Sequence, residues 1–266
     1  MDKASFIGLL FGFIAVGAGM ALKGVSPLAI INPGALLIIF LGTAAAVLIA
    51  FPMSTLKKIP TLLKIIFTED QNNNAAEIIT DFTKWAETTR KQGILWLEGK
   101  LDNVNDPFLR SGMQLAIDGQ SSDFIREVMM EKVYAMEERH QKGVSIFTQA
   151  GTYAPTLGVL GAVIGLIAAL SDLNDIETLG SAISAAFIAT LLGIFSGYVL
   201  WHPFANKLRE KSENEVRVKQ IMIEGVLSLT SGESPQIIKD KLSSYLSSEE
   251  LAWLEQEDGN AKTESA

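Results

Sequence analysis

Four segments of this chain are long, apolar and free of ionisable side chains, and they constrain the fold more than any other feature. They run from Ser5 to Leu22, Gly34 to Phe51, Ile146 to Leu170 and Ser181 to Trp201, and none contains Asp, Glu, Lys, Arg or His. About 20 apolar residues, at a rise of about 1.5 Å each, cross the hydrocarbon core of a bilayer. The sequence therefore predicts an all-α, polytopic membrane protein with four transmembrane helices.

Composition excludes several classes of function. The chain of 266 residues has no cysteine, only two histidines far apart in sequence, and a formal net charge of -8. A disulfide framework and a thiolate metal site are impossible without cysteine, so we expect no metal and no cofactor. The acidic balance argues against nucleic acid as a partner. No glycine-rich phosphate loop or nucleophile arrangement is visible, and we expect no enzymatic activity.

The basic residues predict the orientation. If both termini face the cytoplasm, the loop from Pro52 to Ser145 holds 12 Lys or Arg, the segment after His202 holds 8, and Lys3 adds one. Only Lys23 is left outside. Because cytoplasmic loops carry an excess of Lys and Arg, we expect both termini in the cytoplasm.

The expected organisation has four parts. Residues 1–52 form a transmembrane hairpin, 53–145 a helical cytoplasmic insertion, 146–203 a second transmembrane hairpin, and 204–266 a cytoplasmic helical region with a disordered acidic tail. From Asp123 onward the insertion has the apolar spacing of a packed surface helix. The segment after the fourth span reads as a helix that continues from the membrane into water.

Small residues form a row on each of the last two spans. The third span carries Gly151, Pro155, Gly158, Ala162, Gly165 and Ala169 at intervals of four and three, and the fourth carries Ala182, Ala186, Ala189, Gly193 and Gly197. Small residues gather in membranes where backbones must approach closely. The rows can pack against each other, or they can receive a helix from another chain, and the spacing leaves both interpretations open.

No span contains a titratable residue, although ion and proton carriers normally place one inside the membrane. If ions move here, the carboxylate must come from a partner's helix that lies against the small-residue faces. The residues expected to line that path are Pro155, Gly158, Ala162, Gly165, Ala189, Thr190 and Gly193.

Two residues of this set have alternative interpretations. The hydroxyl of Thr190 can bond a partner carboxyl, or it can bond the carbonyl four residues earlier on its own helix. Pro155 lacks an N–H and should kink the third span, as a hinge or merely as a matter of shape.

The segments QAGTYAPTLGVLGAVIGLIAAL and SAISAAFIATLLGIFSGYVLWHPFANKL, with TTRKQGILWLE and GQSSDFIREVM, resemble the MotA family of stator subunits of the bacterial flagellar motor. The similarity covers nearly the whole chain except the acidic tail. It implies a proton channel in the cytoplasmic (inner) membrane, in which a homopentamer surrounds single-span MotB chains that carry an aspartate. It also implies that the ring pushes the rotor protein FliG.

The resemblance assigns roles to four residues. Pro155 and Pro203 match the family's two functional prolines, and Arg90 and Glu98 match its rotor-facing charges. From the residues alone, Arg90 and Glu98 are eight positions apart, close to two helical turns, which would place them on one face of a helix. Without the resemblance, the same charges would be interpreted as an ordinary solvated face.

Three alternatives remain: sodium coupling, an energiser of envelope transport and a membrane scaffold. Sodium-driven relatives tend to carry threonine at the positions of Ala162 and Ala189, and sodium needs several oxygen ligands, so proton coupling is expected. ExbB or TolQ energisers of envelope transport share the small-residue spans, but they have three spans where this chain has four. From a different class of function, a non-conducting membrane scaffold would dock partners through its insertion.

Overall fold

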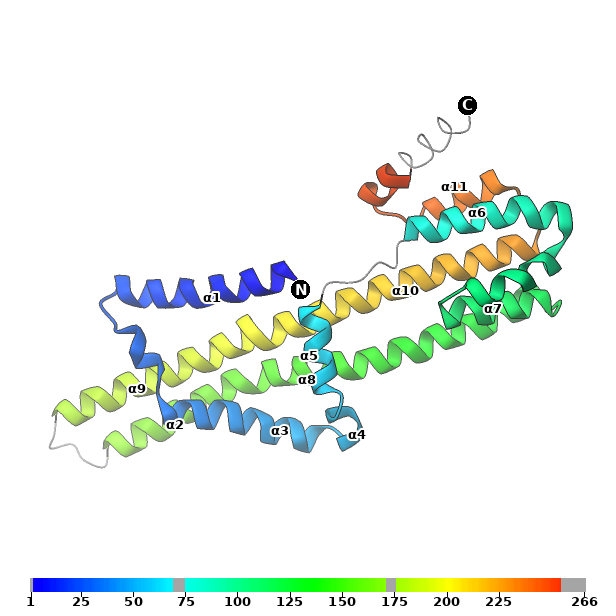
Figure 1. Cartoon of the computed structure of the whole chain (residues 1–266). Coiled ribbons are helices and arrows are strands. Elements are labelled where there is room, and N and C mark those ends of the chain that lie inside the picture. The colour runs from blue at the N-terminus through cyan, green and yellow to red at the C-terminus, as the bar shows by residue number, and fades with distance from the viewer. Residues whose placement is uncertain (1, 69–74, 171–175, 255–266) are drawn as a thin grey trace. The chain divides into compact units, whose positions relative to one another are not determined.

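The computed structural model describes residues 2–68, 75–170 and 176–254, and every regular element within these ranges is a helix (Figure 1). Four helical stretches are long and apolar enough to cross a membrane: Lys3–Leu22, Pro33–Ala50, a window of Ser122–Leu170 and a window of Leu179–Thr230. The prediction of an all-α membrane protein with four spans is therefore confirmed. The predicted disordered acidic tail lies outside the described residues.

The chain divides into two compact units. The first, the membrane unit, comprises Met1–Glu69 and Arg139–Glu210, and the second unit comprises Asp70–Glu138 and Lys211–Ala266. The helices that belong wholly to the membrane unit are α1 (Lys3–Leu22), η1 (Pro27–Ile30), α2 (Pro33–Leu36), η2 (Leu37–Leu41), α3 (Gly42–Ala50), α4 (Met53–Leu56), α5 (Ile59–Phe67), α9 (Ile176–Phe195) and η4 (Ser196–Trp201). Those of the second unit are α6 (Ala75–Gln92), η3 (Ile94–Asn103), α7 (Pro107–Ile117) and α11 (Pro235–Ser243).

Two long helices contribute to both units. α8 (Ser122–Leu170) has 49 residues and joins the amphipathic segment expected from Asp123 to the third span without interruption. α10 (His202–Thr230) follows directly on α9 and η4, so the fourth span continues beyond its apolar stretch as a helix, as the sequence predicts. Pro155 lies inside α8 and does not end it.

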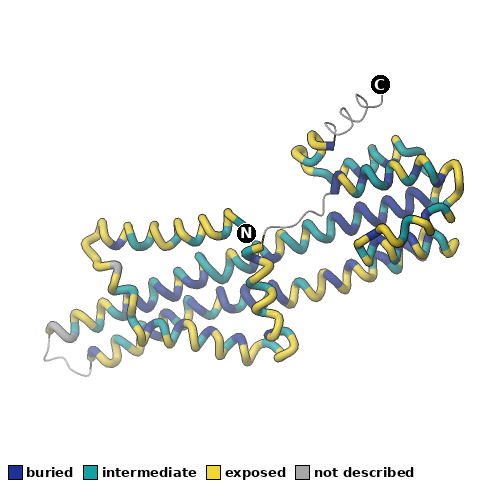
Figure 2. Tube along the Cα trace, in the orientation of Figure 1, coloured by how far each residue is buried: buried dark blue, intermediate teal, exposed yellow. Residues whose placement is uncertain are grey.

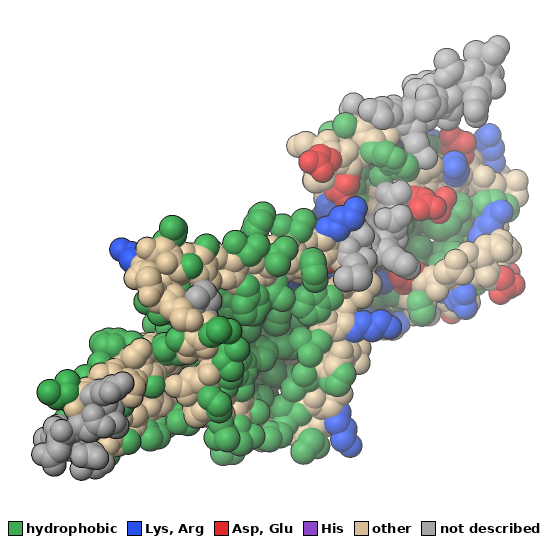
Figure 3. All heavy atoms as spheres, turned by 60° about the vertical axis from the view of Figure 1, so that its left-hand side comes forward, with side chains coloured by type: hydrophobic (Ala, Val, Ile, Leu, Met, Phe, Trp, Pro, Cys, Tyr) green, Lys and Arg blue, Asp and Glu red, His purple; other side chains and the backbone are tan. Residues whose placement is uncertain are grey.

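The membrane unit presents apolar side chains outward. Phe11 of α1 is 64% exposed and Ile49 of α3 is 89% exposed, and Figure 3 shows the broad apolar surface of this unit. A water-soluble protein rarely exposes so large an apolar patch, whereas lipid tails cover such a surface at no cost. Inside the unit, α9 and η4 contact α1 through Gly12 and Val199, and α3 contacts α8 through Gly42 and Leu157.

Asn32 and Pro33 start the second span. The side chain of Asn32 accepts a hydrogen bond from the backbone N–H of Ala35 at 3.1 Å, and Pro33 occupies the first helical position, where its missing N–H costs nothing. Within this span and the fourth, the backbone twice adopts wider π-helical turns, η2 and η4. Such turns are rare inside α-helices.

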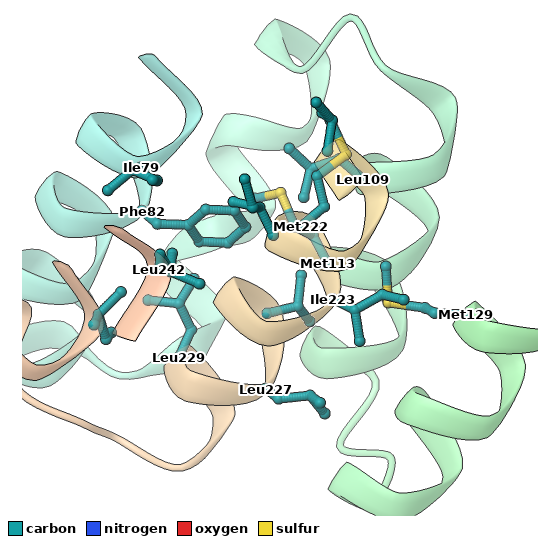
Figure 4. Packing of buried hydrophobic residues seen from close by; sticks show 14 of the residues in the cluster. Ile79, Phe82, Leu109, Met113, Met129, Met222, Ile223, Leu227, Leu229 and Leu242 are labelled. Atoms are coloured by element: carbon teal, nitrogen blue, oxygen red, sulfur yellow. The ribbon is translucent and has the colours of Figure 1, made fainter. Parts of the chain in front are cut away.

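The second unit has its own apolar core (Figure 4). Phe82 of α6, Met113 of α7, Met129 of α8 and Ile223 of α10 are buried there, and the part of α10 in this unit is among the most buried segments in Figure 2. Burying this much apolar surface gives the second unit stability of its own, at about 25 cal/mol per Å² of area removed from water.

Candidate functional site

The small-residue rows of the third and fourth spans meet each other. A Cβ atom built on Gly158 would lie 2.9 Å from both the Cα of Gly193 and the carbonyl oxygen of Ala189. A Cβ atom on Gly193 would lie 2.8 Å from the carbonyl oxygen of Ala154. Only glycine fits at 158 and 193, so these two residues serve the packing of α8 on α9, which is the first of the two interpretations of the rows.

Pro155 explains a second close approach. Proline has no N–H, so the carbonyl of Gly151, four residues earlier, receives no helical hydrogen bond from position 155. That carbonyl oxygen lies 2.8 Å from the place that a Cβ atom of Gly197 would occupy, and Cγ of Pro155 lies at the same distance from it. Gly197 therefore lets the fourth span come close to the third where the proline interrupts its hydrogen bonding.

Away from these contacts the rows are less tightly closed. A Cβ atom on Gly165 would meet Ala186 only at 3.8 Å, which is ordinary van der Waals contact. Ala162 and Gly165 are partly exposed, as are Pro155 and Thr190, whereas Gly158, Ala189 and Gly193 are buried. Of the seven residues expected to line an ion path, three are thus covered by the neighbouring span and four keep accessible surface.

Thr190 bonds its own helix. Its hydroxyl donates to the carbonyl of Ala186 at 3.3 Å, the second of the two interpretations of this residue. Because the side chain is only partly buried, the hydroxyl oxygen still has lone pairs that can accept a further hydrogen bond from outside the chain.

The uncovered side of α8 is apolar. Val159, Val163 and Ile167 are each about half exposed or more, and Thr152 and Thr156 continue the same face. These five positions recur every three or four residues, so they form one stripe along the helix.

The described part of the chain has no group of three acidic, histidine or cysteine side chains that could hold a metal ion.

Pro203 lies at the first turn of α10 and is exposed. It lines a cavity of about 570 Å³ between the N-terminal half of α1 and the end of the fourth span, together with Tyr198, Lys207 and Glu210. Lys207 forms an ion pair with Asp2 at 2.9 Å. Sequence reasoning missed this pair because the two residues are 205 positions apart and no pattern links them.

Arg90 and Glu98 are both exposed on the second unit, but they belong to different elements. α6 ends at Gln92, Gly93 has a φ of +83°, and Glu98 lies in η3. The predicted placement of Arg90 and Glu98 on one helical face is wrong, because Gly93 adopts a left-handed conformation and the helix ends between them. Arg90, Lys91, Glu87 and Pro235 line a pocket of about 340 Å³.

Comparison with known proteins relates this geometry to characterised molecules. Residues 100–221 match the model of the MotA/TolQ/ExbB proton channel family. Motility protein A of Bacillus subtilis is 55% identical over 270 residues, which cover 100% of both chains. The solved structure of the flagellar MotAB stator complex from Bacillus subtilis aligns with a TM-score of 0.88 and 56% identity, and it covers 93% of this chain and 97% of that one. The structure of C. jejuni MotAB gives the same TM-score at 28% identity.

Proposed function

Because this chain belongs to the MotA/TolQ/ExbB proton channel family, we propose that it is a stator subunit of the bacterial flagellar motor. With a single-span MotB-type partner it forms a proton channel and converts proton flow into torque on the rotor. Its similarity to Motility protein A over the full length of both chains favours this function over that of an ExbB or TolQ energiser.

The observation that carries the proposal is the acid-free pair of spans. α8 and α9 pack backbone to backbone at Gly158 and Gly193, yet Pro155, Ala162 and Thr190 keep accessible surface beside that seam. A surface of small side chains with no carboxylate of its own can pack against a partner helix that carries one. An ionised carboxylate is costly in lipid, and a bound proton neutralises it. The partner's aspartate would supply the titratable group.

This chain would contribute two things to the channel: a surface of small side chains that the partner helix packs against, and the hydroxyl of Thr190. A protonated aspartate is neutral and can slide along the wall of α8 and α9, whereas an ionised one is held where water reaches it. The hydroxyl oxygen of Thr190 can accept a hydrogen bond from the protonated carboxyl while its own O–H donates to the carbonyl of Ala186. Each proton that crosses supplies about 2.3 kcal/mol per 100 mV, so torque needs many steps combined.

Pro155 and Pro203 are the proposed coupling residues. Pro155 interrupts the hydrogen bonding of α8 beside Gly197, and Pro203 follows the π-helical segment η4. At both positions the helix has fewer regular backbone hydrogen bonds, so a change in its direction there breaks few of them. Motion at the partner's aspartate would reach the second unit along α8 and α10.

Arg90 and Glu98 are the proposed contacts with the rotor protein FliG. Both are exposed, and charged groups of this kind steer and orient a charged partner without deep burial.

We further propose a homopentamer around the single-span partner, in the bacterial cytoplasmic membrane with both termini in the cytoplasm. The distribution of Lys and Arg supports this orientation.

Proton flux tests the proposal. The chain is coexpressed with its single-span partner, from which any periplasmic plug has been removed, and cytoplasmic pH is followed after external acidification. We expect rapid acidification in sodium-free buffer, and none when the partner's aspartate is replaced by asparagine. Equal acidification with both partners, or none with either while the complex is abundant, would refute the proposed channel. Acidification of sodium-free cells also distinguishes proton from sodium coupling.

A further inference from the structure

Two polar side chains of the membrane unit are buried without a hydrogen-bond partner among the described residues. They are the hydroxyl of Thr43 in α3 and the indole N–H of Trp201 at the end of η4. Thr43 is only 3% exposed. A buried polar group left without a hydrogen bond is costly, and no bulk water reaches a span inside lipid. Two such groups in one unit therefore need a physical explanation.

Thr43 and Trp201 are both associated with the same two apolar clusters. Ile39, Thr43 and Val47 are four residues apart on the second span, so they share one face, and all three are buried. Trp201 packs against the apolar cluster that contains Val47 and also against the cluster that contains Ile39. Trp201 therefore packs against both of the clusters to which the neighbours of Thr43 on this face belong.

Two small, buried side chains of α8 belong to the same two clusters. Ala150 belongs to the cluster with Val47, and Ala154 belongs to the cluster with Ile39. Both are buried, and Ala154 is fully inaccessible. The two clusters join residues of the second, third and fourth spans of a single chain, so a site between them does not depend on how copies of the chain assemble.

Other threonines in the membrane unit show what Thr43 does not do. The hydroxyls of Thr148, Thr152 and Thr190 each donate to the carbonyl four residues earlier. Thr43 makes no such bond. It lies two residues after the π-helical segment η2, and Trp201 is the last residue of the π-helical segment η4. π-helical turns recur at functional sites, because the extra residue in the turn changes where the side chains that follow are directed.

We propose that Thr43 and Trp201 bind one ordered water molecule between the second and fourth spans. The indole N–H is a donor only, whereas the hydroxyl can donate and accept, so a water that accepts from Trp201 and bonds Thr43 satisfies both groups. Two to four polar partners are what a buried water requires. The water ties the second span to the segment that directly precedes Pro203, and this goes beyond the proposed function because it requires no ion flow.

A double-mutant cycle tests the site on the full chain in complex with its single-span partner. The variants are Thr43→Val, which keeps the shape and removes the hydroxyl, Trp201→Phe, and the two together, and the thermal midpoint of complex dissociation is measured. The cavity left by Trp201→Phe is present with either residue at 43, so its cost cancels in the cycle. We expect each single variant to lower the midpoint, and the double variant to lower it by clearly less than the sum of the two single shifts. Purely additive shifts, or no shift with Thr43→Val, would overturn the proposal.

Thr43→Ser is the matched control, because serine keeps the hydroxyl and loses only a methyl group. We expect it to stay closer to the unchanged protein than Thr43→Val does. A map of the complex that resolves waters should show density between Thr43 and Trp201, and this density should vanish in Thr43→Val. Direct contact between the two side chains, or a Thr43 hydroxyl bonded to the carbonyl of Ile39 with no water, would contradict the site. Neither readout uses proton flux, so failure here leaves the proposed function untouched.

Discussion

Gly158 and Gly193 approach so closely that neither tolerates a side chain: a methyl group added to either residue would lie within 2.9 Å of the Cα of the other. Apolar side chains give no net drive for association in lipid, so helices there are held by close packing over short distances. This contact fixes the third and fourth spans as one wall. The proposed channel depends on that wall keeping its shape while a partner helix moves along it.

Gly193→Ala should disrupt the wall, because its Cβ would meet the backbone of Ala154 and Gly158 at 2.8 Å and backbone cannot give way cheaply. We expect a much lower yield of assembled complex and loss of swimming. Gly165→Ala is the matched control on the same seam, since its nearest neighbour would lie 3.8 Å away. Equal amounts of complex from the two variants, measured after purification through the partner, would contradict the assigned contact.

Arg90→Glu and Glu98→Lys should impair swimming while leaving the complex abundant. Both side chains are exposed, so their reversal costs the fold little. The expected result is slower swimming in soft agar with an unchanged proton flux through the unplugged channel. Reversal of the exposed Glu131 in α8 serves as a control for charge reversal as such. Unimpaired swimming after both reversals would argue against a rotor contact at these residues.

Asp106→Asn should destabilise the second unit through Lys219. The ammonium of Lys219 lies 2.6 Å from the carboxylate of Asp106 and is largely buried. Burial acts to raise the pKa of Asp106, but hydrogen bonds from Lys219 and from the backbone N–H groups of Leu109 and Phe108 outweigh it and lower that pKa. Asparagine keeps the helix cap, so the variant isolates the loss of the charge. We expect a loss of about 2 kcal/mol in unfolding free energy.

The second substitution Lys219→Met in the Asp106→Asn background provides the check on that value. It removes the unpaired buried charge, so the double variant should recover much of the lost stability in chemical unfolding. A double variant less stable than Asp106→Asn would show that the cost came from another source.

Glu250→Gln should alter the acid dependence of stability. Arg217 hydrogen-bonds Glu250 at 2.7 Å and lowers the pKa of this carboxyl from 4.5 to about 2. Because the folded pKa is depressed, the stabilisation is complete above about pH 4.5 and is lost as the pH falls towards about 2. The pair is partly exposed, so the contribution is about 1 kcal/mol at neutral pH. Unfolding followed at pH 7 and pH 3 should show a smaller difference between the two pH values in the variant; an unchanged difference would contradict the assignment.

The sequence predicts the spans well because lipid imposes a simple rule on them. A membrane helix needs an uninterrupted apolar stretch, and nothing in residues 5–22 or 34–51 competes with that requirement. The small-residue rows also follow from spacing alone. Spacing does not determine which partner each row meets, because it is equally compatible with a contact between Gly158 and Gly193 and with a foreign helix against Gly158.

Other features depend on long-range packing that no local pattern encodes. Gly93 could have continued α6, and its positive φ separates Arg90 from Glu98 onto two elements. In the sequence, Thr43 and Trp201 are ordinary residues of apolar spans, and only the folded structure shows that their polar atoms are buried without a hydrogen-bond partner. The pairing of Asp2 with Lys207 likewise joins the two ends of the membrane unit's sequence.

Disulfide mapping tests most directly whether the wall of the third and fourth spans receives a partner helix. The chain contains no cysteine, so a single introduced thiol is unambiguous. Ala162→Cys lies on the accessible part of the small-residue row, and Ile49→Cys, 89% exposed on α3, is the control. With a cysteine placed next to the aspartate of the single-span partner, we expect oxidation to cross-link position 162 and not position 49. Efficient cross-linking at 49 with none at 162 would contradict the account.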